Sequence, residues 1–312
     1  MSQKPAVIEE DQFASQYKKI ITNFVKDLDY VPPNTRGADF DISSSQTYQS
    51  LLSEFSPYGT RAGWVEATCL AAASSAELPY PEHPVEVKLL IARFTWYLLY
   101  MDDLGHKDPA SLKTFQHSML TKQTSERSIL EGLRKNLADM SDHWNPIAAN
   151  CITVAGMDFI TGRLMEMEPS IRDMKSSTLA TSWPNYLRVK TGASPGYAFF
   201  IYPTASVPDL STYIQMIEDI RFFIDYANDV LSFYKEALVG ETNNYIHYRA
   251  EVTGKEIVQT IQDVANEVVD THSRISQALE STKASKPWKL FANGLLDFHF
   301  ATKRYRLSDL GF

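Results

Sequence analysis

The chain has 312 residues, of which 44% are hydrophobic and 22% charged, and its formal net charge is −8 at pH 7. This length and apolar content are sufficient for a large buried core. The negative charge argues against a nucleic acid or an anionic membrane as the partner. It also suits an anionic substrate poorly, unless metal ions supply positive charge at the binding site.

The first residues, Met1-Ser2-Gln3-Lys4-Pro5, lack the apolar stretch of a signal peptide. The longest apolar run, Val87–Met101, is too short to span a bilayer and contains two basic residues. The two cysteines, Cys69 and Cys151, lie in apolar helical contexts, which favours buried thiols over a disulfide. We therefore expect a cytoplasmic protein without a membrane span.

Apolar residues recur with helical periodicity along the whole chain. An amphipathic first helix at about Phe13–Leu28 is followed by a polar connector at Thr35–Ser45. We expect residues 1–45 to flank, or to form part of, a single α-helical domain at residues 46–312. The helices expected in that domain are Thr47–Phe55, Arg61–Ala73, Pro84–Asp102, Ala110–Leu120, Glu126–Ser141, Pro146–Glu166, Trp183–Thr191, Ala193–Tyr202, Leu210–Leu238, Thr253–Ser281 and Lys286–Leu307.

No strand pattern, composition shift or internal repeat competes with this all-α interpretation. The expected helix Pro84–Asp102 is apolar almost all round, as in the centre of a bundle, but ends in Asp102-Asp103. Two acids at the negative end of a helix dipole are unfavourable, and a bound divalent cation would remove the penalty. We assign Asp102 to a metal ion and Asp103 to a solvated turn before Gly105.

A second polar cluster consists of Asn228, Ser232 and Glu236, which are spaced i, i+4, i+8. This spacing places three oxygen-bearing side chains on one face of a helix. Such a set can hold a hard cation such as Mg²⁺, although a polar face that meets water is the simpler alternative. If the two helices face each other, their clusters form a metal-lined mouth over an apolar cavity, which suits an apolar tail with a phosphate head.

Residues 228–236 match the pattern Asn-Asp-(Leu/Ile/Val)-x-Ser-x-x-x-Glu in full. In this motif the chain resembles class I terpene synthases, and most closely the trichodiene synthase group of fungal sesquiterpene cyclases. The resemblance covers about Val87 to Leu310 and implies a helical bundle around an apolar active-site cavity. It also implies a diphosphate-binding lysine at Lys235, a diphosphate-sensing arginine at Arg188 and an Arg-Tyr pair at Arg304-Tyr305.

The acidic motif departs from the usual Asp-Asp-x-x-Asp of such families. Gly105 and His106 stand where a further acid would fall, and Asp108 comes later than usual. Asp102 is therefore the only carboxylate that we transfer from that motif. The resemblance further implies a helix break near Gly192 and Pro195, which would expose a carbonyl toward the cavity.

The resemblance implies that the protein ionises farnesyl diphosphate, with Mg²⁺ (three ions in the family) neutralising the leaving group. The expected metal ligands are Asp102, Asn228, Ser232 and Glu236. The expected hydrogen-bond donors to the diphosphate are Arg188, Lys235, Arg304 and Tyr305. Aromatic faces would stabilise the cation. The candidate substrate contacts are Phe94, Tyr97 and Gly192, together with Phe199, Phe200, Phe222 and Tyr226, although core packing is the better interpretation for most of these rings.

Two alternatives stay open at this point. A transferase that joins two isoprenoid diphosphates usually carries two Asp-Asp-x-x-Asp motifs, so the Asn/Ser/Glu cluster favours cyclisation. A non-catalytic helical protein that binds isoprenoids is the other alternative. The histidines His247, His272 and His299 show no metal-ligand spacing and are assigned no site. Related enzymes are often dimers, so a homodimer is left open.

Overall fold

The computed structural model describes residues 10–33, 41–58, 63–121 and 129–312. Helices, short 3-10 turns and loops make up these ranges and no strand occurs in them, which confirms the all-α prediction. In chain order the helices are α1 (Glu10–Asp27), α2 (Gln46–Phe55), α3 (Trp64–Glu77), α4 (Val85–Leu104), α5 (Pro109–Thr121), α6 (Leu130–Asp139), α7 (Pro146–Met167), α8 (Pro169–Arg172), α9 (Trp183–Gly192), α10 (Ser194–Phe200), α11 (Ile217–Leu238), α12 (Tyr245–Thr253), α13 (Ile257–Leu279) and α14 (Ser285–Ala301).

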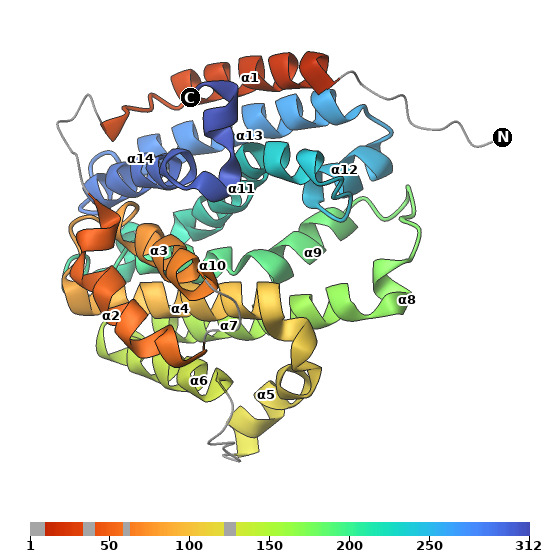
Figure 1. The fold of residues 1–312 in the computed structure, drawn as a ribbon. Helices are drawn as coiled ribbons and strands as arrows, with labels where there is room; N and C mark the ends of the chain where they lie inside the picture. The colour runs from red at the N-terminus through yellow and green to blue at the C-terminus, as the bar shows by residue number, and fades with distance from the viewer. Residues whose placement is uncertain (1–9, 34–40, 59–62, 122–128) are drawn as a thin grey trace.

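The helix α4 lies in the interior, as its apolar sequence predicts. Ile91, Phe94 and Trp96 are fully buried along it. It packs against α2, α3, α6 and α7, and Figure 1 shows α4 and α7 side by side. α11 packs against α10 and α13, and α14 contacts both α11 and α13. α11 also contacts α9 and the 3-10 turn Lys303–Tyr305 that follows α14, so the elements that carry Asp102, Arg188, Asn228 and Arg304 surround one region.

The N-terminal helix α1 lies on the same helical core. It packs against α13 and α11, and Figure 1 places it alongside α13. The buried hydroxyl of Tyr17 donates a hydrogen bond to the carbonyl of Val230 on α11 (2.5 Å). Residues 35–40 of the predicted connector Thr35–Ser45 lie outside the described residues. The rest of the connector contains a 3-10 turn at Ile42–Ser44.

Several helix boundaries differ from the sequence prediction. α11 begins at Ile217 because the preceding segment forms two 3-10 turns, Leu210–Thr212 and Ile214–Met216. The last helix ends at Ala301, before a 3-10 turn and a residue with positive φ, Arg306 (57°). Helices α8 and α12 were not predicted. The starts of two predicted helices, residues 61–62 and 126–128, lie outside the described residues.

The predicted helix break is present between α9 and α10. Gly192 ends α9, and Ala193 adopts a left-handed conformation (φ 51°) before α10 begins. Pro195 occupies the first turn of α10, where a missing N–H costs nothing. Within the described ranges, no helix combines the length and apolarity needed to cross a bilayer.

Candidate active site

A cavity of about 240 Å³ lies between α4, α9, α11 and α14. Its polar lining residues are Ser75, Thr95, Asp102, Arg188, Thr191, Asp225, Asn228, His299 and Arg304, and Tyr305 adds a hydroxyl. Its large apolar lining residues are Tyr80, Leu98, Leu99, Phe159, Tyr197, Ile224, Phe291, Leu295 and Phe298. Asp102 and Arg304 are about 40% exposed, whereas Tyr80 and Phe291 are buried. The cavity thus has a charged mouth and an apolar floor.

Asp102 is held at this mouth by two arginines. One carboxylate oxygen lies 3.0 Å from Nη1 of Arg163, and the other lies 3.5 Å from Nη2 of Arg304. Arg163 also donates a hydrogen bond to the carbonyl of Asp102 (3.1 Å). The prediction that Asp103 lies in a solvated turn is wrong. α4 continues to Leu104, and the Asp103 carboxylate accepts a hydrogen bond from the indole of Trp64 (2.9 Å).

The second cluster occupies one face near the end of α11, as its spacing requires. Ser232 is buried and donates a hydrogen bond to Oε1 of Glu236 (2.6 Å), and Nζ of Lys235 lies 3.4 Å from the same oxygen. One turn earlier, Asn228 lines the cavity together with Asp102. Its amide nitrogen lies 3.4 Å from the hydroxyl of Tyr305. The structure therefore brings one member of each predicted cluster to the same cavity.

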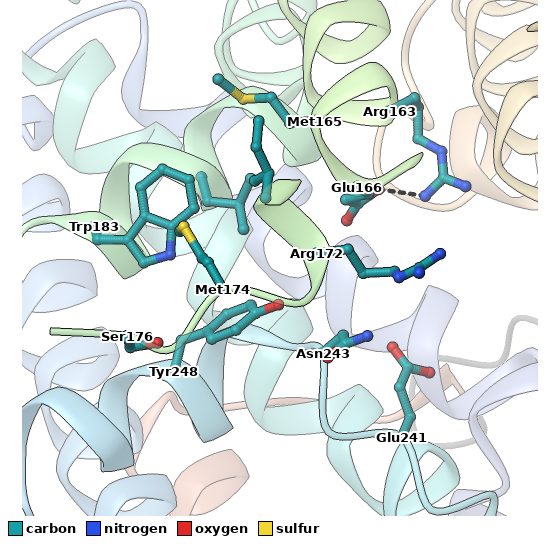
Figure 2. A pocket seen from close by; sticks show the side chains of 12 residues that line it. Arg163, Met165, Glu166, Arg172, Met174, Ser176, Trp183, Glu241, Asn243 and Tyr248 are labelled. Atoms are coloured by element: carbon teal, nitrogen blue, oxygen red, sulfur yellow. Dashed lines mark hydrogen bonds and ion pairs between the residues drawn. The ribbon is translucent and has the colours of Figure 1, made fainter. Parts of the chain in front are cut away.

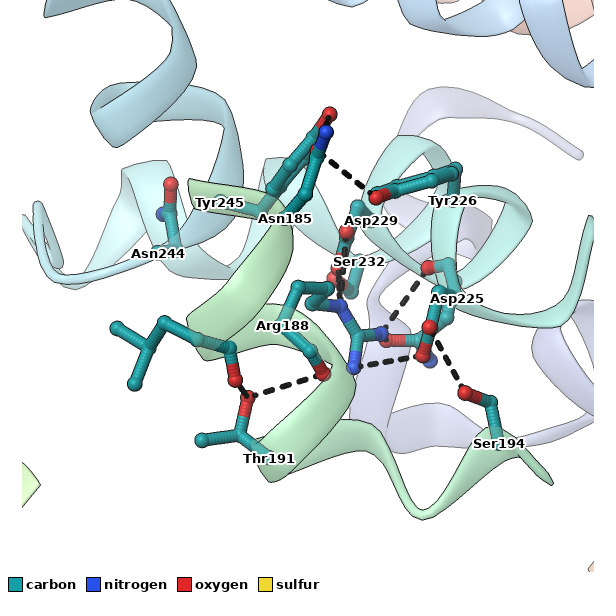
Figure 3. Close-up of polar contacts among 12 residues, drawn as sticks. Asn185, Arg188, Thr191, Ser194, Asp225, Tyr226, Asp229, Ser232, Asn244 and Tyr245 are labelled. Carbon is teal, nitrogen blue, oxygen red and sulfur yellow. Dashed lines mark hydrogen bonds and ion pairs between the residues drawn. The ribbon is translucent and has the colours of Figure 1, made fainter. Parts of the chain in front are cut away.

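Arg188 is at the centre of a buried charge network (Figure 3). Its Nε donates to both carboxylate oxygens of Asp229 (2.8 and 2.9 Å), and Nη1 lies 3.0 Å from Oδ1 of Asp225. Nη2 donates to the Asp225 carbonyl (3.0 Å) and to Oδ1 of Asn228 (3.3 Å). Burial opposes the charged guanidinium, but Asp229 and Asp225 outweigh it and raise the pKa of Arg188. Burial raises the pKa of Asp229, and Arg188 offsets part of that rise.

Asp225 holds this network together. Its carboxylate is 1% exposed and accepts hydrogen bonds from Arg221 (2.6 Å) and from the Ser194 hydroxyl (2.7 Å), in addition to its ion pair with Arg188. Sequence analysis did not identify this residue. The available signal was an aspartate within the apolar run that precedes Asn228, since a buried carboxylate requires partners.

Gly192 is the point of closest approach to the network. A Cβ atom at this position would lie 2.1 Å from Oδ1 of Asp225 and 2.4 Å from Nη1 of Arg188. Only glycine leaves space for both groups, so the residue at the end of α9 is required by packing against α11. Gly192 also lines the cavity, and its contact with substrate stays a prediction.

The structure does not bring Phe94 and Tyr97 to the cavity lining, although it describes both residues. Phe94 packs edge-on against Tyr197 and Phe200, with centroid distances of 5.8 and 5.3 Å. Tyr97 packs against Trp96 and Phe55. Substrate contact by these two rings stays a prediction. The other four candidate rings, which are Phe199, Phe200, Phe222 and Tyr226, are also absent from the lining residues.

A second pocket of about 260 Å³ lies beside the first and is shown in Figure 2. It is bounded in part by Arg163, which also contacts Asp102, and by Glu166, with which Arg163 forms an ion pair. Burial raises the pKa of Glu166. Of the predicted site residues, all of which the structure describes, none lines this pocket. The cavity lined by Asp102, Arg188 and Asn228 is therefore the candidate active site.

The donor atoms at the candidate site fit a hard cation. They are carboxylate, amide and hydroxyl oxygens, which Mg²⁺ prefers, and thiol and imidazole ligands are not part of the predicted set. No group of three or more His, Cys, Asp or Glu residues that could hold a metal occurs among the described residues. The predicted ligand set combines the neutral oxygens of Asn228 and Ser232 with the carboxylates of Asp102 and Glu236.

The comparisons with known proteins decide the family. The model of the trichodiene synthase (TRI5) family matches residues 67–311. The chain belongs to this family. Terpene synthase BipA from Cochliobolus sativus is 32% identical over 302 residues, which cover 92% of this chain and 88% of the relative. Longiborneol synthase CLM1 from Gibberella zeae is 29% identical, with coverage of 96% and 88%.

A solved structure supports the fold independently of close sequence similarity. The linalool/nerolidol synthase of Streptomyces clavuligerus, crystallised with 2-fluorogeranyl diphosphate, aligns with a TM-score of 0.63 at 13% identity. The alignment covers 85% of this chain and all of that one. This member of the trichodiene synthase family therefore has the predicted class I terpene synthase fold. It is a terpene synthase, a carbon–oxygen lyase that acts on phosphates. Its family implies a prenyl diphosphate substrate and typically uses Mg²⁺.

Proposed function

We propose that the protein is a cytoplasmic sesquiterpene synthase that ionises farnesyl diphosphate in a Mg²⁺-dependent reaction and cyclises the resulting cation. The observation that carries the proposal is the convergence of Asp102, Arg188, Asn228, Arg304 and Tyr305 on one cavity with an apolar floor. A charged mouth over an apolar interior matches a substrate with a diphosphate head and a hydrocarbon tail.

Asp102 would hold Mg²⁺ from α4, and Asn228, Ser232 and Glu236 would hold it from α11, with three ions in all as in related enzymes. When bound, these ions neutralise the diphosphate and make it a better leaving group. Of the acidic motif that ends α4, the proposal assigns only Asp102 to a metal; the Asp103 carboxylate accepts a hydrogen bond from the indole of Trp64. The α11 cluster therefore supplies most of the proposed ligands.

The cations proposed to bind diphosphate are already close to acceptors. Arg188 is paired with Asp229, Arg304 lies near Asp102, and Lys235 lies near Glu236. Diphosphate oxygens must compete with these carboxylates for the same N–H donors. A divalent cation that binds Asp102 and Glu236 would release Arg304 and Lys235. We therefore expect the metal and the diphosphate to bind together rather than separately.

The bond that breaks is the one between the first carbon of the prenyl chain and the diphosphate oxygen, which keeps the electron pair. Arg188, Lys235, Arg304 and the Tyr305 hydroxyl would donate hydrogen bonds to the departing group. The allylic cation would then react with its own double bonds in a cavity that excludes bulk water. The final cation would lose a proton to the retained diphosphate or to a water, which gives the neutral product. The aromatic faces that line the cavity can stabilise such a cation, and they belong to Tyr80, Phe159, Tyr197, Phe291 and Phe298.

The length of the substrate rests on relatives. One relative, from Postia placenta, is named monoterpene synthase 25 and is 34% identical over 72% of this chain. Others are named (E)-beta farnesene synthase and alpha-cuprenene synthase, after products that are sesquiterpenes. The resemblance to sesquiterpene cyclases at residues 228–236 favours the longer substrate.

The test is incubation of the purified protein with geranyl, farnesyl or geranylgeranyl diphosphate, each with and without MgCl₂, followed by mass spectrometry of the headspace. We expect a volatile cyclic sesquiterpene from farnesyl diphosphate only when Mg²⁺ is present. Turnover confined to geranyl diphosphate would replace the sesquiterpene assignment with a monoterpene one. Unchanged substrate in every tube would contradict the proposal.

A further inference from the structure

His299 is a buried polar residue that the proposed chemistry does not use. It lies on α14 and is 1% exposed, with its ring packed against Tyr305 (centroid distance 4.4 Å) and Phe298. Its Nδ1 lies 2.7 Å from the carbonyl oxygen of Leu295, and its Nε2 lies 3.0 Å from Nδ2 of Asn228. His299 therefore connects α14 to the first residue of the α11 cluster.

The tautomer of His299 follows from these two contacts. The carbonyl oxygen of Leu295 can only accept a hydrogen bond, so Nδ1 must carry the proton. The ring is buried against Tyr305, Phe298 and the Asn228 amide, where an unpaired positive charge would be unfavourable, so the ring is neutral. In a neutral ring with a protonated Nδ1, Nε2 carries only a lone pair and must accept a hydrogen bond.

This requirement determines the orientation of the Asn228 amide. Only the NH₂ group of Asn228 can donate to the Nε2 lone pair, so Nδ2 must face His299. The carbonyl oxygen Oδ1 then faces the opposite side, where it accepts a hydrogen bond from Nη2 of Arg188 (3.3 Å). A flipped amide would place Oδ1 against the histidine lone pair and would present an NH₂ group, which cannot bind a metal, to the ligand side.

We propose that His299 is a positioning residue that selects the metal-binding orientation of the Asn228 amide. This inference rests on the proposed function, because it requires that Asn228 Oδ1 is a metal ligand. Groups that orient a metal ligand typically change metal affinity by about 10- to 100-fold when they are removed. His299 contacts neither diphosphate nor the prenyl chain in this role, and it acts only through Asn228.

The test compares substitutions at position 299 by calorimetric titration of inorganic pyrophosphate at a series of MgCl₂ concentrations. His299→Phe keeps an aromatic ring but removes the acceptor, and we expect it to raise the Mg²⁺ concentration required for half-maximal binding by about 10- to 100-fold. His299→Gln can place an amide oxygen near the position of Nε2, so we expect it to restore most of the affinity. His299→Asn can keep the bond to Leu295 but is too short to reach Asn228, and we expect it to resemble His299→Phe.

The decisive comparison uses Asn228→Asp as a second background. Both distal atoms of aspartate are oxygens, so His299 has no orientation to select; one of these oxygens faces Nε2, and only a protonated ring could pair with it. We expect His299→Phe to weaken Mg²⁺-dependent binding when residue 228 is Asn but not when it is Asp, which is a strong interaction in the double-mutant cycle. An equal loss of pyrophosphate affinity in both backgrounds, or no loss in either, overturns the inference. If His299→Phe does not fold, the difference in affinity between His299→Gln and His299→Asn decides whether His299 orients Asn228.

The two claims fail in different ways in this experiment. If the unmodified protein binds no pyrophosphate at any Mg²⁺ concentration, the proposed function is wrong. If the unmodified protein binds and all the position 299 variants bind equally well, the proposed function stands and the role of His299 is wrong.

Discussion

At the scale of single residues, the candidate site depends on close approaches that leave no spare volume. Gly192 is the clearest case, because the Asp225 carboxylate and the Arg188 guanidinium occupy the space that a side chain at this position would need. The family resemblance implied a helix break and a substrate contact at Gly192. Its second role, which is to admit the two charged groups, depends on α11 and was not visible from local spacing.

Gly192→Ala is expected to disturb the site through this contact. The added Cβ must displace Asp225 or Arg188, and overpacking of this kind typically costs about 1–3 kcal/mol of unfolding free energy. Urea unfolding and Mg²⁺-dependent pyrophosphate binding would both detect the change. Gly196→Ala is the matched control, because its Cβ meets only ordinary contacts at 3.4 Å or more. Equal behaviour of the two variants would show that the close approach at Gly192 has no consequence.

Glu236→Gln is expected to abolish turnover of farnesyl diphosphate while the protein stays folded. The amide keeps an acceptor for the Ser232 hydroxyl but loses the charge that a metal ligand needs. Since a group that merely orients a ligand is worth about 10- to 100-fold, loss of a ligand should reduce kcat by at least about 100-fold. Thermal unfolding would verify the fold. The control is Glu251→Gln, an exposed substitution on α12 that should leave turnover unchanged. Undiminished activity of Glu236→Gln would show that Glu236 is not a metal ligand.

At the scale of helices, sequence periodicity placed most elements, and the errors have physical causes. α12 was missed because the polar residues Asn243-Asn244 resemble a loop, yet Asn244 is the N-cap of the helix. Its side chain accepts a hydrogen bond from the backbone N–H of His247, three residues on, which is the spacing of a capping interaction. The predicted start of α11 was too early because apolar residues before Ile217 belong to 3-10 turns.

Asn244→Ala should therefore destabilise the protein through α12. Loss of an N-cap typically costs about 1 kcal/mol, and urea unfolding would measure it. Asn244→Asp keeps a side-chain acceptor at the same position and should be close to the unmodified protein. If the alanine and aspartate variants have the same unfolding free energy, the cap does not stabilise α12.

At the scale of the whole molecule, the sequence separation between contacting site residues explains which contacts could be predicted from the sequence. The spacing of Asn228, Ser232 and Glu236 is local to one helix, so the sequence predicts that they share a face. The partners that hold the site are remote: Arg163 lies 61 residues from Asp102, and His299 lies 71 residues from Asn228. Such contacts depend on tertiary packing, which a single sequence does not display, and His299 was set aside for lack of metal-ligand spacing.

Buried histidines should make the whole fold sensitive to acid. Burial lowers the pKa of His83 to about 4, against about 6.5 in the unfolded chain, and its Nε2 contacts the Phe200 carbonyl (2.8 Å). Between these values the unfolded chain binds a proton that the folded protein does not, so stability falls as the pH falls through that window. At pH 5 the cost from His83 is up to about 2 kcal/mol.

His83→Gln tests this effect, because its amide can still donate to the Phe200 carbonyl but does not titrate. Urea unfolding at pH 7 and pH 5 should show a smaller loss of stability in this variant than in the unmodified protein. Carboxylates titrate alike in both proteins, so the difference isolates the histidine. An identical loss in the two proteins would rule out His83 as a source of acid sensitivity.

We propose that α4 and α11 together hold metal ions that bind a diphosphate at the mouth of the apolar cavity. The decisive measurement is a crystal structure of the protein with Mg²⁺ and inorganic pyrophosphate. We expect oxygen atoms of Asp102, Asn228, Ser232 and Glu236 at about 2.0–2.1 Å from the ions. The phosphate oxygens should accept hydrogen bonds from Arg188, Lys235, Arg304 and Tyr305. Ions and pyrophosphate bound elsewhere, for example between Glu166 and Glu241 in the neighbouring pocket, would contradict it.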